Sequence, residues 1–144
     1  MLRNVEIKVD LESLNKSINI TGIIYFEIDF YRYYPDENWS DFVVIILSWW
    51  IKSMKALILS KIGRTYEFNF MDGSPVVLAK KISNEDIELT CYDEGILICN
   101  IKQLRDSLLS TSKKVLREID RKKWESDEIE ELQSLTISLE RYPF

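Results

Sequence analysis

The amino-acid sequence predicts an α+β fold: an antiparallel sheet of about six strands, a buried central helix and two C-terminal helices. Apolar and polar residues alternate in two stretches before residue 32 and again between residues 66 and 101, which is typical of half-buried strands. Residues 40–60 are apolar nearly all round and contain neither Gly nor Pro. After residue 101 the apolar spacing becomes helical. Helices that are segregated from hairpins, here in the order ββ-α-ββββ-αα, indicate an α+β protein.

One domain is expected to span residues 1–144. A chain of 144 residues is close to the commonest domain size, and 46% hydrophobic content is that of an ordinary globular protein. The sequence contains no internal repeat, low-complexity tract or linker rich in Pro and Gly. Nothing therefore indicates a second domain.

Two strands are predicted at the N-terminal end. The first has alternate apolar residues that should face the core, namely Val5, Ile7, Val9 and Leu11. The second has the same pattern at Ile24, Phe26, Ile28 and Phe30. Because proline removes a backbone donor, this second strand should end at Tyr33–Tyr34–Pro35.

A helix is predicted over residues 40–60. Asn38 or Ser40 can cap its free N–H groups, and Asp41 suits the positive end of its dipole. The β-branched run at residues 43–46 would also suit a buried strand, but the segment is longer than a typical strand. Trp49 and Trp50 would point about 100° apart, so one should lie in the core and the other near an edge.

An antiparallel meander of four strands is predicted next. Tyr66, Phe68 and Phe70 alternate with Glu67 and Asn69 in its first strand. Its three further strands contain Val76, Leu78 and Lys80; Ile87, Leu89 and Cys91; and residues 96–101. Asp72–Gly73 is a strong hairpin signal, and Asp93–Glu94–Gly95 supplies the last turn.

Two helices should complete the fold. The first has a single apolar stripe made of Ile101, Leu104, Leu108, Val115 and Ile119. Ser126–Asp127 can cap the second, which continues through Ile129, Leu132, Leu135 and Leu139. Because Leu135, Ile137 and Leu139 also alternate, residues 135–142 could form a strand instead.

The chain lacks the residues that most enzyme sites need. It contains no His, which removes the commonest acid–base group and the Ser-His and Cys-His nucleophile pairs. Its four glycines stand far apart, so no phosphate-binding loop is present. Cys91 and Cys99 without His cannot complete a zinc site and are expected to be buried hydrophobes. We therefore predict no catalytic residue, no cofactor, no metal and no enzyme activity.

Charge and hydropathy indicate where the protein acts. A net charge of −5 repels free nucleic acid. The basic stretch at residues 102–123 is followed by an acidic stretch at 125–131, which is typical of a solvated, self-compensating surface. No signal-peptide segment is recognisable at the start, and the longest apolar run is about half a membrane span. We expect a cytoplasmic protein without membrane contact.

Aromatic and acidic residues define the expected binding surface. Tyr and Trp are enriched in interface hot spots, and seven of them fall between Tyr25 and Trp50. Pro35 stiffens a corner that we expect to protrude and to contact a basic protein partner. The predicted surface comprises Tyr31, Tyr33, Tyr34, Asp36 and Glu37, with the turn carboxylates Asp72, Asp93 and Glu94.

Two blocks of the sequence resemble small immunity proteins of bacterial polymorphic-toxin systems. They are Asn38-Trp39-Ser40-Asp41-Phe42-Val43-Val44-Ile45-Ile46-Leu47-Ser48-Trp49-Trp50 and Phe70-Met71-Asp72-Gly73-Ser74-Pro75. The resemblance implies a stoichiometric inhibitor whose partner is a toxin domain, and it assigns no binding residues. The acidic balance suits a basic nuclease toxin, which complementary charge would help to occlude.

Two further hypotheses stay open. The chain can be a structural or regulatory subunit, for example a homodimer formed through its apolar helix or strand edges. It can also be an enzyme or small-ligand binder that uses carboxylates such as Asp36, Glu37 and Asp41.

Overall fold

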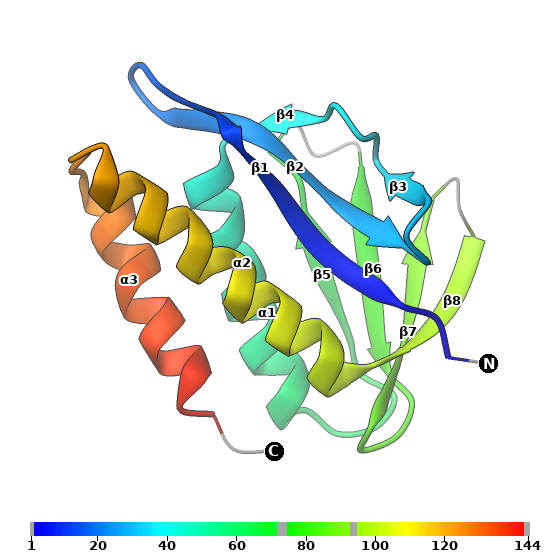
Figure 1. Ribbon diagram of the computed structural model, residues 1–144. Helices are drawn as coiled ribbons and strands as arrows, with labels where there is room; N and C mark the ends of the chain where they lie inside the picture. The colour runs from blue at the N-terminus through cyan, green and yellow to red at the C-terminus, as the bar shows by residue number, and fades with distance from the viewer. Residues whose placement is uncertain (1, 72–74, 93–94, 143–144) are drawn as a thin grey trace.

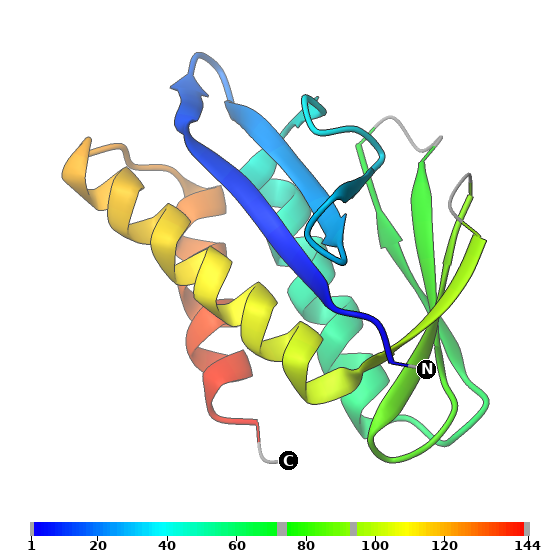
Figure 2. The same ribbon diagram turned by 45° about the vertical axis from the view of Figure 1, so that its right-hand side comes forward.

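The structure, a computed structural model, describes residues 2–71, 75–92 and 95–142. The chain is α+β, as the sequence predicts, with three helices in the described part (Figure 1). Its strands form two antiparallel sheets of four strands each, so the prediction of one sheet of about six strands is wrong. The helices lie together at one side of the two sheets (Figures 1 and 2).

The N-terminal sheet contains β1 (Val5–Lys16), β2 (Ile20–Ile28), β3 (Arg32–Tyr34) and β4 (Ser40–Asp41). β2 is central, with β1 on one side and the short strands β3 and β4 on the other, and all three pairings are antiparallel. Burial alternates along β2, since Ile24, Phe26 and Ile28 are fully buried and the residues between them are half-buried. The period-two pattern therefore predicted the faces of this strand correctly.

The second predicted strand ends earlier than expected, because a tight turn follows Ile28. Asp29 and Phe30 both have positive φ, 51° and 71°, and the Tyr31 N–H donates to the carbonyl of Ile28 at 3.3 Å. Positive φ at both central residues is the property of a type I′ hairpin turn. Phe30, predicted to face the core, is instead exposed, and residues 32–34 form the separate strand β3.

Helix α1 (Val43–Leu59) is the predicted central helix. It begins later than expected because Ser40 and Asp41 pair with β2, and its N-cap is Phe42, without a side-chain cap from Asn38 or Ser40. At its other end the buried Lys81 Nζ donates to the carbonyls of Ile58 and Ser60, at 2.8 and 2.9 Å. A cation at a helix C-terminus is favourable both for the dipole and for the free carbonyls.

The second sheet is the predicted meander of β5 (Thr65–Asn69), β6 (Val76–Lys81), β7 (Asp86–Cys91) and β8 (Gly95–Asn100), paired in that order. The predicted turn residues Asp72–Gly73 and Asp93–Glu94 lie outside the described residues. Cys91 and Cys99 point inward from β7 and β8 and are buried, as expected.

The core lies between the two sheets and α1, where aromatic rings meet. Trp50 on α1 packs against Phe26 of β2 and Phe68 of β5, with ring centroids 4.9 and 6.3 Å apart. Phe70 lies 5.1 Å from Trp50. Trp50 is fully buried and Trp49 is exposed, which confirms the prediction that one tryptophan lies in the core and the other near an edge.

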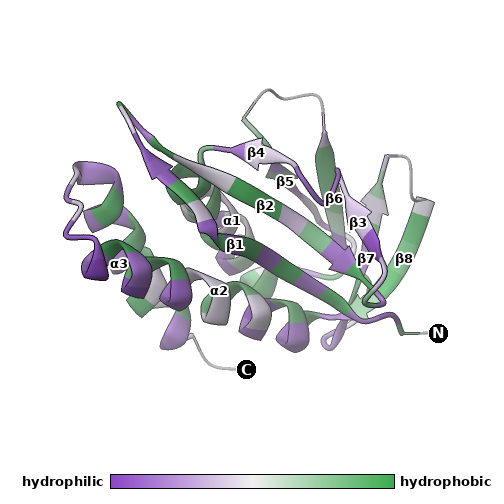
Figure 3. Ribbon diagram, turned by 45° about the horizontal axis from the view of Figure 1, so that its top comes forward, coloured by the Kyte–Doolittle hydropathy of each residue, from purple (hydrophilic) through white to green (hydrophobic). Residues whose placement is uncertain are grey.

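Helices α2 (Ile101–Arg121) and α3 (Asp127–Glu140) pack beside α1. All five residues of the predicted α2 stripe are buried. The Ser126 hydroxyl caps α3 by accepting from the Ile129 N–H at 3.2 Å, and residues 135–140 are helical, so the strand alternative for this tail is wrong. Exposed turns of α2 and α3 are mostly hydrophilic (Figure 3). Within the described part of the chain, no helix combines the length and apolar character that a membrane span requires.

Candidate functional site

The outer face of the N-terminal sheet, together with the turn and corner beside β3, carries aromatic rings among carboxylates. Because core-facing and outward residues alternate, this face presents Glu6, Lys8 and Asp10 of β1, Tyr25 and Glu27 of β2, and Tyr33 of β3. We call the following set the aromatic–acidic surface: Glu6, Asp10, Tyr25, Glu27, Phe30, Tyr31, Tyr33, Asp36 and Glu37. Its strands belong to a sheet whose other face lies on the core, so its backbone is held rigidly.

Tyr25 and Tyr33 form the centre of this surface. Their rings meet edge to face, with centroids 5.4 Å apart and an interplanar angle of 82°. Burial raises the pKa of Tyr25, and the neighbouring Glu27 carboxylate raises it further. The Tyr25 phenol therefore stays neutral at physiological pH and can offer its hydroxyl group to a partner.

Carboxylates surround this tyrosine pair. Register places Glu27 between Glu6 on β1 and Tyr33 on β3, and it places Asp10 opposite Ile23 near the other end of β2. Lys8, opposite Tyr25, forms an ion pair with Glu6 at 3.3 Å. Negative charges thus outnumber the single ammonium on the strand face, as a site for a cationic partner requires.

The turn between β2 and β3 adds two exposed aromatic side chains, Phe30 at 69% and Tyr31 at 67% exposure. Asp29, between the strand and these rings, accepts hydrogen bonds from the Arg3 guanidinium and from the backbone N–H of Asn4. These bonds lower the pKa of the Asp29 carboxyl, the Arg3 guanidinium being the larger cause. The turn is therefore fastened to the N-terminal segment and holds its aromatic side chains out to solvent.

The corner after β3 is as exposed as predicted. Asp36 and Glu37 are both exposed, and the Asp36 carboxylate accepts from the Asn38 N–H at 2.9 Å. Its own carbonyl accepts from the Trp39 N–H at 3.2 Å. These local hydrogen bonds fix the corner and do not involve the Glu37 carboxylate.

Tyr34 does not belong to this surface, contrary to the prediction. It is 4% exposed, because Tyr33 and Tyr34 are consecutive strand residues and point to opposite faces. The Tyr34 hydroxyl reaches the second sheet, where it donates to the Val76 carbonyl at 3.2 Å and accepts from the Val76 N–H at 3.3 Å. Its role in the structure is to join the sheets.

Three other predicted surface residues, Asp72, Asp93 and Glu94, lie outside the described residues. The basic stretch 102–123 and the acidic stretch 125–131 were predicted to compensate each other's charge. Among the described ion pairs, none joins a residue of the first stretch to a residue of the second. Arg121 pairs with Glu118, Lys113 pairs with Glu140, and Glu131 pairs with Lys52 of α1 at 2.7 Å.

Asp41, a carboxylate that the enzyme hypothesis would use, is held by hydrogen bonds within the fold. Asp41 is 8% exposed and accepts from the Trp39 Nε1–H at 2.9 Å, the Phe42 N–H at 2.8 Å and the Met71 N–H at 3.1 Å. Those three donors occupy three of the roughly four acceptor sites of the carboxylate, which leaves little of it for a substrate or a metal. Among the described residues, no group of three or more Cys, Asp or Glu side chains is arranged to hold a metal ion.

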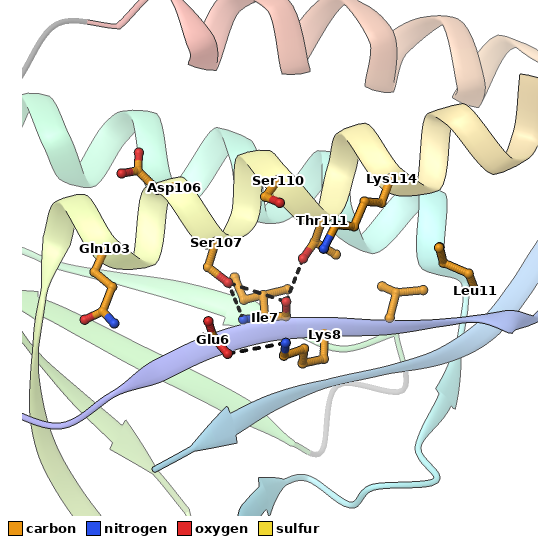
Figure 4. Close-up of a pocket in the computed structure, with 11 residues that line it drawn as sticks. Glu6, Ile7, Lys8, Leu11, Gln103, Asp106, Ser107, Ser110, Thr111 and Lys114 are labelled. Atoms are coloured by element: carbon orange, nitrogen blue, oxygen red, sulfur yellow. Dashed lines mark hydrogen bonds and ion pairs between the residues drawn. The ribbon is translucent and has the colours of Figure 1, made fainter. Parts of the chain in front are cut away.

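A groove of about 490 Å³ runs between β1 and α2 (Figure 4). At its floor, the Ile7 N–H donates to the Ser107 hydroxyl at 2.8 Å, and the Thr111 hydroxyl donates to the Ile7 carbonyl at 2.7 Å. The Ser107 and Thr111 hydroxyls thus make the hydrogen bonds to the edge of β1 that a neighbouring strand would otherwise make. The groove walls mix Glu6 and Asp106 with Lys8 and Lys114, so they favour neither sign of charge.

The members of this surface that sequence reasoning did not select are Glu6, Asp10, Tyr25, Glu27 and Phe30. Alternation signalled that Glu6 and Asp10 face outward, but only the pairing of β1 with β2 brings them beside Tyr25. Comparison of the chain with models of known protein families, with curated proteins and with solved structures finds no match.

Proposed function

We propose that the chain is a non-catalytic protein-binding module of the immunity type, which binds a basic bacterial toxin domain and neutralises it. The observation that carries the proposal is the aromatic–acidic surface. Its edge-to-face tyrosine pair is flanked by carboxylates on a rigid strand face. Tyrosines supply contact area at a low cost in conformational entropy, and carboxylates steer a cationic partner toward them.

The geometry also supports binding in preference to turnover. Asp41, the least exposed of the candidate carboxylates, is occupied by backbone and indole donors. The exposed carboxylates Asp36 and Glu37 stand on a corner, whereas substrates are usually held in concave sites. We expect no hydrolase, nuclease or transferase activity in a broad substrate screen; turnover that disappears in Asp41→Asn with the fold intact would contradict this.

The test uses the full chain as bait in a lysate of its source cells and identifies the retained protein. The proposal expects a basic toxin domain whose toxicity is suppressed when the two proteins are co-expressed. The variant Asp36→Lys/Glu37→Lys should slow association most at low salt, because rim charges act mainly on the on-rate. Tyr33→Ala should instead speed dissociation, by about 2 kcal/mol or more if the ring is a hot spot.

A matched control keeps the same charge change elsewhere. Glu128→Lys/Glu130→Lys alters two exposed carboxylates on α3 and should leave the association rate close to that of the parent chain. If the α3 variant loses binding and the corner variant does not, the interface lies on α3. A retained protein that is harmless to cells in the absence of this chain would contradict the immunity function itself.

A further inference from the structure

Two glutamates lie directly opposite each other on the outer face of the N-terminal sheet. Glu6 of β1 and Glu27 of β2 are partners in the strand register, and both residues are half-buried. Like charges at directly opposite positions destabilise a pair of strands. Lys8 compensates one of the two, because its ammonium pairs with the Glu6 carboxylate at 3.3 Å. Within the described part of the chain, the Glu27 carboxylate has no ion pair and accepts no hydrogen bond.

Two tyrosine rings stand beside Glu27 on the same face. Tyr33 is its register partner on β3, and Tyr25 lies two residues before it on β2. The rings are nearly perpendicular, at 82°, with centroids 5.4 Å apart. In such a pair, the ring that presents its edge keeps both of its own faces clear of the other ring. The electron-rich face of a tyrosine and a neighbouring carboxylate attract a cation together.

The described part of the chain brings no cation to Glu27. Lys8 is engaged with Glu6. Arg32 lies opposite the buried Ile28 in the register of β2 and β3, so it points to the other face of the sheet. Figures 1 and 2 show no helix or strand over the outer face of β2. This sheet face is therefore open, and a cation that pairs with Glu27 has to come from another molecule.

The arrangement suits arginine better than lysine. A guanidinium is planar, stacks on aromatic faces and presents its donors in a fork that matches a carboxylate. The ammonium of lysine is a compact and strongly hydrated point charge, which gains less from an aromatic face. Beside Glu27, a guanidinium can lie against a tyrosine ring, donate to this carboxylate and leave its other donors toward Glu6.

We propose that Glu27, Tyr25 and Tyr33 form a receptor for one arginine side chain of the partner protein, whose guanidinium stacks on a tyrosine ring and pairs with the Glu27 carboxylate. The receptor rests on the proposed function, since the aromatic–acidic surface is taken as the interface with the basic partner. In the free chain the opposed glutamates repel each other, and a bound guanidinium removes that repulsion. Glu27 therefore favours binding and disfavours the free fold.

Blocked peptides of five arginines or five lysines test the receptor without a toxin. They carry equal charge, and each is titrated into the full chain at low salt while backbone amide NMR follows residues 25, 27 and 33. The parent should bind the arginine peptide about three- to fivefold more tightly than the lysine peptide, which is the gain expected from an exposed aromatic contact. Equal affinities for the two peptides would overturn the proposal.

Three variants assign the effect to this site. Glu27→Gln keeps the shape of the side chain and should weaken binding of the arginine peptide at least about fivefold. Tyr33→Leu keeps an apolar side chain without an aromatic face, so the affinities for the two peptides should become similar. Glu85→Gln is the matched control, because it removes one exposed charge between β6 and β7 and should bind like the parent. Equal effects of Glu27→Gln and Glu85→Gln would contradict the receptor.

The melting temperature separates a binding role for Glu27 from a structural one. Glu27→Gln removes one of two opposed charges, so its Tm should equal or exceed that of the parent. A clear fall in Tm would mean that Glu27 stabilises the fold, and the receptor would then be refuted.

The peptide result and the proposed immunity function can fail independently. Because the peptides replace the toxin, the preference for arginine is expected even if the lysate yields no toxin. A toxin that the parent and Glu27→Gln bind equally well would refute the receptor and leave the immunity function standing.

Discussion

Replacing Tyr34 by Phe removes only the hydroxyl group that joins the two sheets. That hydroxyl makes two hydrogen bonds to the Val76 backbone, at 3.2 and 3.3 Å, from a side chain that is 4% exposed. Phe keeps the ring and its edge-to-face contact with Phe70, 6.4 Å between centroids, so no cavity forms. The variant then loses two long hydrogen bonds. The half-buried N–H and C=O of Val76 are left without this partner. We expect a cost of about 1 to 2 kcal/mol in the free energy of unfolding.

Chemical denaturation, with thermal unfolding as a second measurement, would check this value. For a chain of this size the expected fall in Tm is roughly 3 to 6 °C. Tyr33→Phe is the control, because the Tyr33 hydroxyl on the outer face makes no hydrogen bond within the described structure. It should stay within about 0.5 kcal/mol of the parent. Equal costs for the two variants, or no cost for Tyr34→Phe, would refute the assignment of Tyr34 as the link between sheets.

Three further predictions concern the core and its polar contacts. Asp41→Ala leaves three N–H donors without their acceptor and should cost about 3 kcal/mol or more in unfolding free energy. Asp41→Asn keeps one acceptor oxygen and should cost less. Equal costs for the two variants would argue against the three-donor site. Ile46→Asp buries an unpaired charge at a fully buried position of α1 and should cost several kcal/mol, whereas Ile45→Asp, at a half-buried neighbour, should cost much less. Burial raises the pKa of the Cys99 thiol to about 12, so the native state holds this proton more tightly than the unfolded state. That stabilisation is complete below the unfolded pKa and is lost as the pH rises toward 12; thiol labelling at pH 8 should therefore occur only on unfolding, and rapid labelling of native protein would contradict the burial.

Sequence periodicity predicted most elements but not how the strands divide into sheets. Alternation shows which face of a strand is buried, and it says nothing about which strand lies next to it. The division depends on tertiary contacts: Ser53 and Trp50 of α1 bond the free edge of β5, so β5 cannot pair with the N-terminal sheet. The start of α1 was misplaced for a similar reason, because pairing of Asp41 with Gly22 draws residues 40–41 into β4.

The predicted binding surface was partly recovered for equally local reasons. Tyr31, Asp36 and Glu37 are exposed because they belong to a turn and a corner, which composition indicates well. Tyr34 was misassigned because a cluster of aromatic residues does not reveal which of two consecutive strand positions faces the core. Phe30 continued an alternating pattern, but positive φ at Asp29 and Phe30 ends the strand and reverses the chain before that residue can turn inward.

The hydroxyl contacts between β1 and α2 also constrain how the chain can fold. The hydrogen bond from Thr111 to Ile7 joins residues that are 104 positions apart, which is among the largest sequence separations of any contact in the chain. A contact of that separation forms late and slowly, because a long loop must be closed before any stabilisation is gained. During synthesis the N-terminal hairpin leaves the ribosome well before α2 does, and its outer edge stays open to other extended chains in that interval. Chaperone demand for this protein should therefore concentrate in the period between the synthesis of residue 28, where β2 ends, and that of residue 111.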